Sequence, residues 1–147
     1  MKAKEKLTVF VAHSFAADDM PVFNAVADVI RRAGFSVSSG DRPEALTVSS
    51  KVRGLIESAD IFVAIMTHRH EVVGKHLWTT NPWVIEEKGY ALGQKPLRPI
   101  VALVEENIPV PTETGGLEGD LEVIFFNRKR FDAAQKKLRQ VLATLKP

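Results

Sequence analysis

An uninterrupted apolar segment, Ile61–Met66, limits the folds open to this chain more than any other feature. A run of this kind, without polar alternation, is typical of a strand buried on both faces of a parallel sheet. Leu7–Ala12 is a second short apolar segment, and an amphipathic helical pattern follows it and stops at Gly34. The sequence therefore predicts a parallel sheet covered by helices.

The alternation of strand and helix patterns continues to the end of the chain and predicts its topology. The predicted strands are Leu7–Ala12, Phe35–Ser38, Ile61–Met66, Pro99–Val104 and Leu121–Phe126. The predicted helices begin at Asp18 or Asp19, near Thr47 to Ser50, at Asn81 and at Asp132. We predict one domain over residues 1–147, an α/β flavodoxin-like five-stranded parallel sheet of order 2-1-3-4-5 with helices on both faces.

The composition narrows the possible functions. No apolar run approaches the roughly 18 to 20 residues needed to span a bilayer. The net charge is only +2 and the basic residues are scattered along the chain, so we expect neither nucleic acid nor a membrane as a partner. The chain has no cysteine, which excludes disulfides and thiolate metal sites and favours a cytoplasmic location.

Several familiar motifs are missing. Ala12–Ala16 follows the first strand without the glycines of a dinucleotide-binding loop, and no G-x-S-x-G hydrolase motif is present. His68, His70 and His76 share a loop with Glu71, a set that has the chemistry of a zinc site. We interpret that segment, within Thr67–Thr80, as a solvated loop and predict no metal.

Trp83 and Glu87 are the strongest candidates for a functional pair. Asn81 can cap a helix that has Pro82 at its first position, so Trp83 and Glu87, four residues apart, share one face of its first two turns. That helix begins at the edge where the carboxyl ends of the strands meet, which is where ligands bind in such sheets. A carboxylate beside a large aromatic side chain at this edge favours a sugar or nucleotide site. Glu86 projects about 100° away from Glu87.

The chain resembles a TIR domain, in particular the bacterial TIR and TIR-like enzymes, over roughly residues 6 to 145. The segments that carry the resemblance are Val9–Phe15 with Asp18-Asp19, Ala33–Val37, Ile56–Ile65, and Trp83–Ala91, which matches the pattern W-x-x-x-E-x-x-x-A. The last pattern holds the catalytic glutamate of family members that cleave NAD.

The resemblance implies that Glu87 is the catalytic residue of an NAD+ nucleosidase, with NAD+ as substrate and no cofactor. Trp83, Ser14, Phe15 and His13 are then expected to bind the substrate. A flap named the BB loop in this family corresponds to Ser39–Leu46, and Asp41 and Arg42 within it are further substrate-binding candidates. The products expected are ADP-ribose or a cyclic isomer.

The family's biology implies partners as well. Bacterial members often serve in antiphage immunity and become active when oligomerisation through the BB loop, or an activating protein, completes the site. Two alternatives stay open at this point. The first is a nucleoside 2-deoxyribosyltransferase, because these enzymes also have a glutamate before a stretch like Glu87–Leu92, although this chain lacks their companion aspartate motif. The second is a non-catalytic TIR adaptor module.

Overall fold

The computed structural model describes residues 6–40, 49–110 and 122–146. Their main element is a five-stranded sheet of order β2-β1-β3-β6-β7, in which every neighbouring pair is parallel. The strands are β1 (Thr8–Ala12), β2 (Ser36–Ser38), β3 (Ile61–Met66), β6 (Ile100–Glu105) and β7 (Glu122–Phe126). Counted within this sheet, the order is the predicted 2-1-3-4-5, so the flavodoxin-like fold is confirmed.

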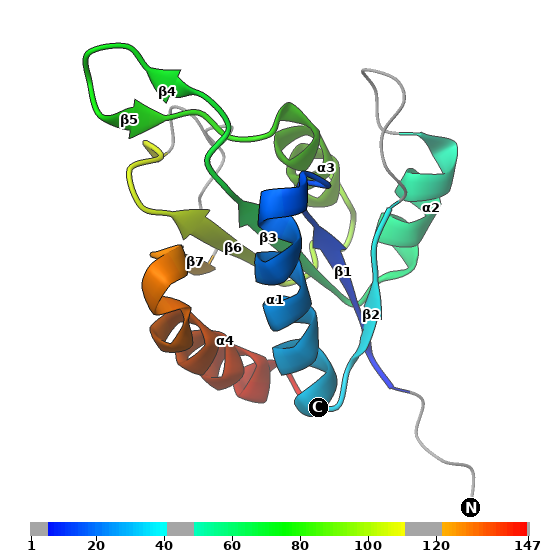
Figure 1. Ribbon diagram of the computed structural model, residues 1–147. Coiled ribbons are helices and arrows are strands. Elements are labelled where there is room, and N and C mark those ends of the chain that lie inside the picture. Colours follow the sequence, from blue (N-terminus) through cyan, green and yellow to red (C-terminus); the bar gives the residue numbers. More distant parts are fainter. Residues whose placement is uncertain (1–5, 41–48, 111–121, 147) are drawn as a thin grey trace, which may run out of the picture.

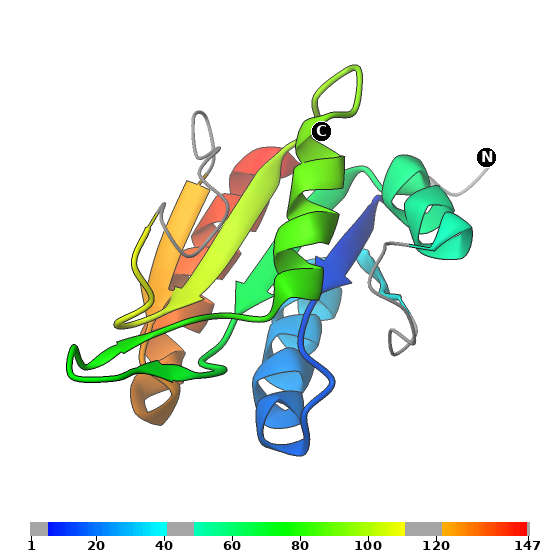
Figure 2. The same cartoon turned by 90° about the horizontal axis from the view of Figure 1, so that it is seen from above.

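Four α-helices cover the two faces of the sheet (Figures 1 and 2). On one face α1 packs beside α4, and on the other α2 packs beside α3. The helices are α1 (Met20–Arg32), α2 (Ser50–Ser58), α3 (Pro82–Leu92) and α4 (Phe131–Leu145). All residues of β3 and β6 are buried, as a strand sandwiched between two helical layers requires.

Local chemistry fixes several helix boundaries. The Ser49 hydroxyl accepts a hydrogen bond from the Val52 amide at 3.2 Å, and the Asn81 side chain accepts one from the Trp83 amide at 2.9 Å. Both are the N-terminal caps that the sequence predicts. Gly34 ends the first helical segment with φ of +95°, a conformation that strains any side chain.

Asp18 and Asp19 do not cap α1 as predicted. They belong to a 3₁₀ turn, η1 (Ala17–Asp19), and no side-chain hydrogen bond caps α1 at Asp19. The Asp19 carboxylate binds Thr67 and Arg128 instead. The competing partners are distant in sequence, which is why the local pattern did not reveal them.

The segment predicted as a polar loop between β3 and α3 contains a small antiparallel hairpin. Its strands are β4 (Glu71–Val72) and β5 (Leu77–Trp78), and it projects beyond the body of the molecule (Figures 1 and 2). Gly74 and His76 adopt positive φ in the connecting turn. Two-residue strands give almost no periodic signal, so the loop prediction was wrong for these residues.

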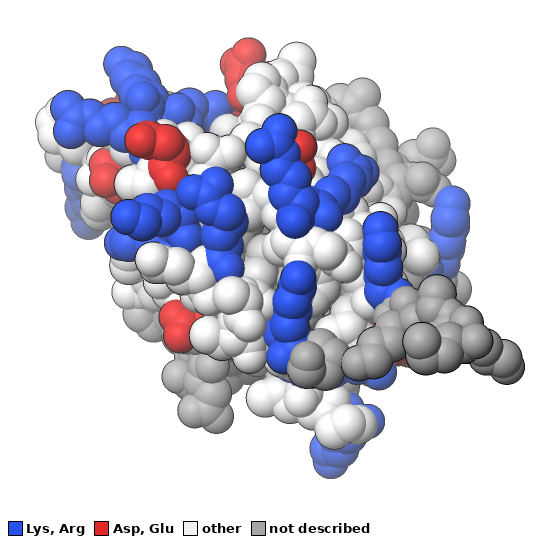
Figure 3. Space-filling view, turned by 90° about the horizontal axis from the view of Figure 1, so that it is seen from below, with Lys and Arg blue, Asp and Glu red and all other residues white. Residues whose placement is uncertain are grey.

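The face seen in Figure 3 carries many Lys and Arg side chains and few Asp or Glu side chains. Arg31 and Arg32 lie in the last turn of α1, where a positive charge interacts favourably with the negative end of the helix dipole. Arg32 also pairs with Asp28 at 3.0 Å. A second basic turn, η2 (Arg128–Arg130), precedes α4. The charges of Arg31 and Arg32 are exposed, so they stay hydrated and add little stability, whereas Arg128 is partly buried. No helix in the described ranges has the length and apolar character to cross a bilayer.

Candidate active site

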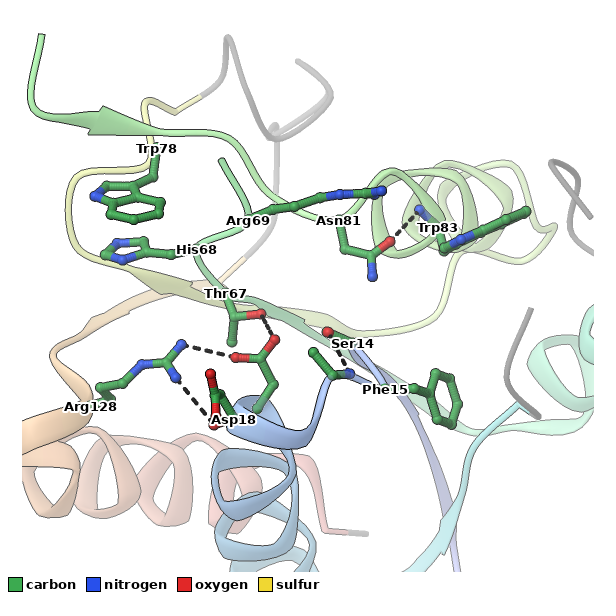
Figure 4. A pocket seen from close by; sticks show the side chains of 12 residues that line it. Ser14, Phe15, Asp18, Thr67, His68, Arg69, Trp78, Asn81, Trp83 and Arg128 are labelled. Carbon is green, nitrogen blue, oxygen red and sulfur yellow. Dashed lines mark hydrogen bonds and ion pairs between the residues drawn. The ribbon is translucent and has the colours of Figure 1, made fainter. Parts of the chain in front are cut away.

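A hollow of about 640 Å³ lies at the carboxyl edge of the sheet. Loops after β1, β3 and β7 meet there with the start of α3, next to the β1–β3 junction where the strand order reverses. Figure 4 shows this site. Its lining residues are Ser14, Phe15, Ala16, Asp18, Asp19, Thr67, His68, Arg69, Trp78, Asn81, Trp83 and Arg128.

Arg128 organises the floor of the hollow. Its Nε and Nη2 donate to the two carboxylate oxygens of Glu105 at 2.7 Å each, and Nη2 also reaches Asp19 at 3.0 Å. Nη1 donates to the carbonyl oxygen of Asp18 at 3.2 Å. The hydrogen bonds to Glu105, and then to Asp19, raise the pKa of Arg128, which therefore stays charged and offsets two buried carboxylates.

The same network holds the end of β3 in place. The Thr67 hydroxyl donates to Asp19 at 3.0 Å, and the Thr80 hydroxyl donates to the Thr67 carbonyl at 2.8 Å. The His68 amide donates to Glu105 at 2.8 Å. Three loops that are far apart in sequence are thus fixed to one another, so the floor is preorganised before any ligand arrives.

A stacked pair, His68 and Trp78, forms the wall on the hairpin side. Their ring centroids are 4.5 Å apart with planes inclined by 7°. The His68 Nε2 atom lies 2.5 Å from the Glu106 carbonyl oxygen, and the Trp78 amide donates to the Asn107 carbonyl at 2.8 Å. The His68 ring and the Trp78 backbone are therefore tied to the segment that follows β6.

The loop after β1 supplies Ser14 and Phe15 to the lining of the hollow, but it turns His13 inward. The His13 ring stacks on Phe23 with the ring centroids 3.8 Å apart, and its centroid lies 4.5 Å from that of Phe15. Its Nδ1 forms a hydrogen bond with the Ser14 carbonyl oxygen at 2.8 Å. Burial lowers the pKa of His13, so the ring is neutral. The structure places His13 outside the lining of the hollow, and its predicted role in binding has no support from this position.

Helix α3 brings Trp83 to the rim of the hollow. The Asn81 cap and Pro82 set the direction of its first turn, and Trp83 lies beside Asn81 in Figure 4. Glu87 follows one turn later, half-buried, and is not among the lining residues. Glu86 is exposed. The side chains of Glu86 and Glu87 are thus in different environments, as the helical geometry predicts.

Burial makes Glu87 a weaker acid than an ordinary glutamate. Desolvation raises the pKa of Glu87 from 4.5 to about 7. Near neutral pH this side chain therefore exists in both protonation states, a property that concentrates at functional sites.

The pKa of Glu87 predicts a pH-dependent stability. Between pH 4.5 and about 7 the folded protein binds more protons than the unfolded chain, so the free energy of unfolding falls as pH rises. Glu87→Gln has a neutral side chain at every pH, so it does not lose this stability as pH rises. The difference in the free energy of unfolding, variant minus wild type, should therefore increase by about 1 kcal/mol from pH 4.5 to about 7, a value that allows for the partial exposure of Glu87. Thermal unfolding of both proteins at pH 4.5, 6 and 8 measures this difference, and Glu86→Gln is the control. Plots of stability against pH that run parallel for the wild type and Glu87→Gln would contradict the prediction.

Asp41 and Arg42 lie outside the described residues, so their predicted roles stay predictions. Gly40, directly before them, is constrained by its neighbour: a Cβ atom there would come within 2.9 Å of Val52 Cγ2. At Gly40, the second residue of the predicted flap, the chain therefore passes too close to α2 for a side chain.

The three histidines of the predicted loop separate in the structure. His68 packs under Trp78, whereas His76 is fully exposed near the hairpin turn, with its Nδ1 4.0 Å from Glu71. No group of three or more His, Asp or Glu side chains in the described part of the chain is arranged to hold a metal ion.

Comparisons with known proteins show what the fold is similar to. No family model and no curated protein matches the sequence. Among solved structures, the CMP N-glycosidase BcmB of Clostridium botulinum has a TM-score of 0.59 at 17% identity, with 90% of this chain and 98% of that chain covered. The RPS4 and RRS1 TIR domain heterodimer has a TM-score of 0.56 at 10% identity, with 96% of each chain covered.

The same fold also occurs in a flavoprotein. A diflavin flavoprotein A3 from Nostoc sp. has a TM-score of 0.56 at 12% identity, covering 96% of this chain and 90% of that chain. Identities this low establish the fold and leave the activity to be argued from the site. The fold is that of TIR domains, of an N-glycosidase and of flavodoxin-like proteins.

Proposed function

We propose that this chain cleaves the N-glycosidic bond between nicotinamide and ribose in NAD+, with Glu87 as the catalytic residue. The observation that carries the proposal is the position of Glu87: half-buried, of raised pKa, and one helical turn from Trp83 at the rim of the hollow. The match of Trp83–Ala91 to the W-x-x-x-E-x-x-x-A pattern of TIR enzymes and the TIR-like fold point the same way.

The chemistry suits a single carboxylate. When the bond between ribose C1′ and the ring nitrogen breaks, the electron pair goes to nicotinamide, which leaves neutral without a general acid. The ribose is left with oxocarbenium character, and the ionised Glu87 stabilises that positive charge. A water molecule then adds to C1′ and releases a proton, giving ADP-ribose; attack by the adenine ring gives a cyclic isomer instead. No cofactor takes part.

The other predicted residues take supporting roles in this proposal. Trp83 and Phe15 provide apolar surface for the nicotinamide ribose, and Ser14 lines the same side of the hollow. In Figure 4 the Trp83 and Phe15 rings both extend to the side away from the hairpin. Asp41 and Arg42 are proposed to contact the substrate from the flap.

A glycosidase of nucleosides or mononucleotides is the second candidate. The similarity of the fold to a CMP N-glycosidase favours it, as does the stretch Glu87–Leu92. Incubating the protein with NAD+, CMP and deoxynucleosides in parallel, followed by chromatography of released bases, separates the two. Nicotinamide release supports the first candidate, and base release from CMP or a deoxynucleoside alone supports the second. No release from any of them favours the adaptor module.

We expect the activity to depend on self-association through the flap Ser39–Leu46 or on an activating protein. If a neighbouring molecule completes each site, only the associated fraction is competent, and specific activity rises steeply with protein concentration. Charge reversal at Asp41 or Arg42 should flatten this rise. The measurement is nicotinamide release from nanomolar to high micromolar protein; a constant specific activity would exclude the idea.

A further inference from the structure

The hollow has two ends with different chemistry. Trp83, which precedes Glu87 on α3 by one helical turn, stands at one end, and the stacked pair of His68 and Trp78 stands at the other (Figure 4). Arg69 and Asn81 lie between these ends, and all of these residues except Glu87 belong to the lining. A site for a ribose and one base at Trp83 leaves the hairpin end unused.

We propose that this hairpin end binds the adenosine half of a dinucleotide substrate, with the base stacked on the His68–Trp78 pair. The inference rests on the proposed function and deepens it, because it selects a dinucleotide over a nucleoside. It gives a role to β4 and β5, which the catalytic chemistry at Glu87 does not use.

The pair is suited to stacking because its rings are already fixed. The His68 ring is held by the Glu106 carbonyl, the Trp78 backbone is held by Asn107, and the two rings pack against each other, so little side-chain freedom is lost when a base binds. Aromatic surfaces bind the flat face of any base, and alanine substitution of such a residue costs roughly 5- to 150-fold in affinity.

Arg69 is placed to meet the pyrophosphate that joins the two halves. Its amide donates to the Thr79 carbonyl at 2.9 Å, which fixes its backbone at the base of the hairpin, and its exposed side chain extends toward Asn81 and Trp83 (Figure 4). Arg128, in contrast, is already paired with Glu105 and Asp19. Arg69 is therefore the lining guanidinium with capacity for a new anion.

The acidic side of the hollow suits a sugar better than a phosphate. Asp18 is an exposed carboxylate of the lining, and carboxylates accept hydrogen bonds from ribose hydroxyls in other dinucleotide sites. The loop after β1 also lacks the glycines that wrap a phosphate. The volume, about 640 Å³, lies within the range of sites for ligands of nucleotide size.

The test compares two substrates that share the scissile bond. NAD+ carries the adenosine half and nicotinamide mononucleotide lacks it. For Trp78→Ala we expect the KM for NAD+ to rise about tenfold or more, with kcat and the KM for the mononucleotide unchanged; Trp78→Phe should restore most of the binding of NAD+. Val73→Ala is the matched control, since Val73 is on the hairpin but 96% exposed.

A binding measurement keeps this inference separate from the proposed activity. Calorimetry with AMP should show binding to the wild type and a loss of at least tenfold in affinity for Trp78→Ala, with far-UV circular dichroism to verify folding. AMP binding that depends on Trp78 in a protein that releases the base of CMP but no nicotinamide from NAD+ would support the subsite and refute the proposed function. Cleavage of NAD+ whose KM is the same in the wild type and Trp78→Ala, or the absence of AMP binding to the wild type at millimolar concentration, would overturn the subsite.

Discussion

Glu87→Ala should lower the rate of NAD+ cleavage by about 100- to 1,000-fold while the protein stays folded. The reason is that Glu87 supplies the only negative charge assigned to the oxocarbenium-like ribose. Its carboxylate is half-buried and its pKa is about 7, so removing it relieves a desolvation cost and does not break a known ion pair. The rate is measured as nicotinamide release at a protein concentration where the wild type is fully active.

The neighbouring glutamate provides the control for this experiment. Glu86 is exposed and projects about 100° away along the helix, so Glu86→Ala should retain nearly the whole rate. Glu87→Gln separates charge from shape, because it keeps the size of the side chain and should lose as much activity as Glu87→Ala. Equal losses for Glu86→Ala and Glu87→Ala would show that the catalytic carboxylate has been wrongly assigned.

Arg128→Met should destabilise the fold by about 3 kcal/mol, or roughly 10 °C in Tm. The substitution leaves Glu105 and Asp19, both nearly fully buried, without the guanidinium that donates to them. Buried carboxylates that lose their counter-charge are costly even where the original ion pair contributed little. Thermal and urea unfolding at pH 7 measure the loss.

Two further variants test the reason for that loss. Lys129→Met changes an exposed neighbour in the same turn and should leave Tm within about 1 °C. Glu105→Gln in the Arg128→Met background removes one of the two uncompensated charges and should recover part of the lost stability. A double variant that is less stable than Arg128→Met alone would contradict the electrostatic explanation.

The topology could be predicted from the sequence because it depends on long, regular patterns. The apolar segment Ile61–Met66 and the capped helix at Asn81 carry their signals within a few residues, and both elements occur where predicted. The hairpin escaped prediction because Glu71–Val72 and Leu77–Trp78 are too short to show a period.

The candidate site could be predicted only where one helix or one loop carries it. Trp83 and Glu87 were proposed because they share one helix, and Ser14 and Phe15 because they follow β1. Arg128 was not identified from the sequence. Its partners, Glu105 and Asp19, are 23 and 109 residues away, so no local pattern connects them. The inward turn of His13 depends on Phe23 in the same way.

The excursion between β3 and α3 leaves and re-enters the domain at one place. The Thr80 hydroxyl bonds to the Thr67 carbonyl, and the Arg69 amide to the Thr79 carbonyl, so the two stems of the excursion are joined at its base. Helix α3, which carries Glu87, packs on β3, α2 and β1, and these contacts do not involve the hairpin residues beyond that junction. Changes in the length or sequence of the hairpin are therefore expected to leave α3 in place, so the proposed base-binding surface and the proposed catalytic carboxylate are structurally separable.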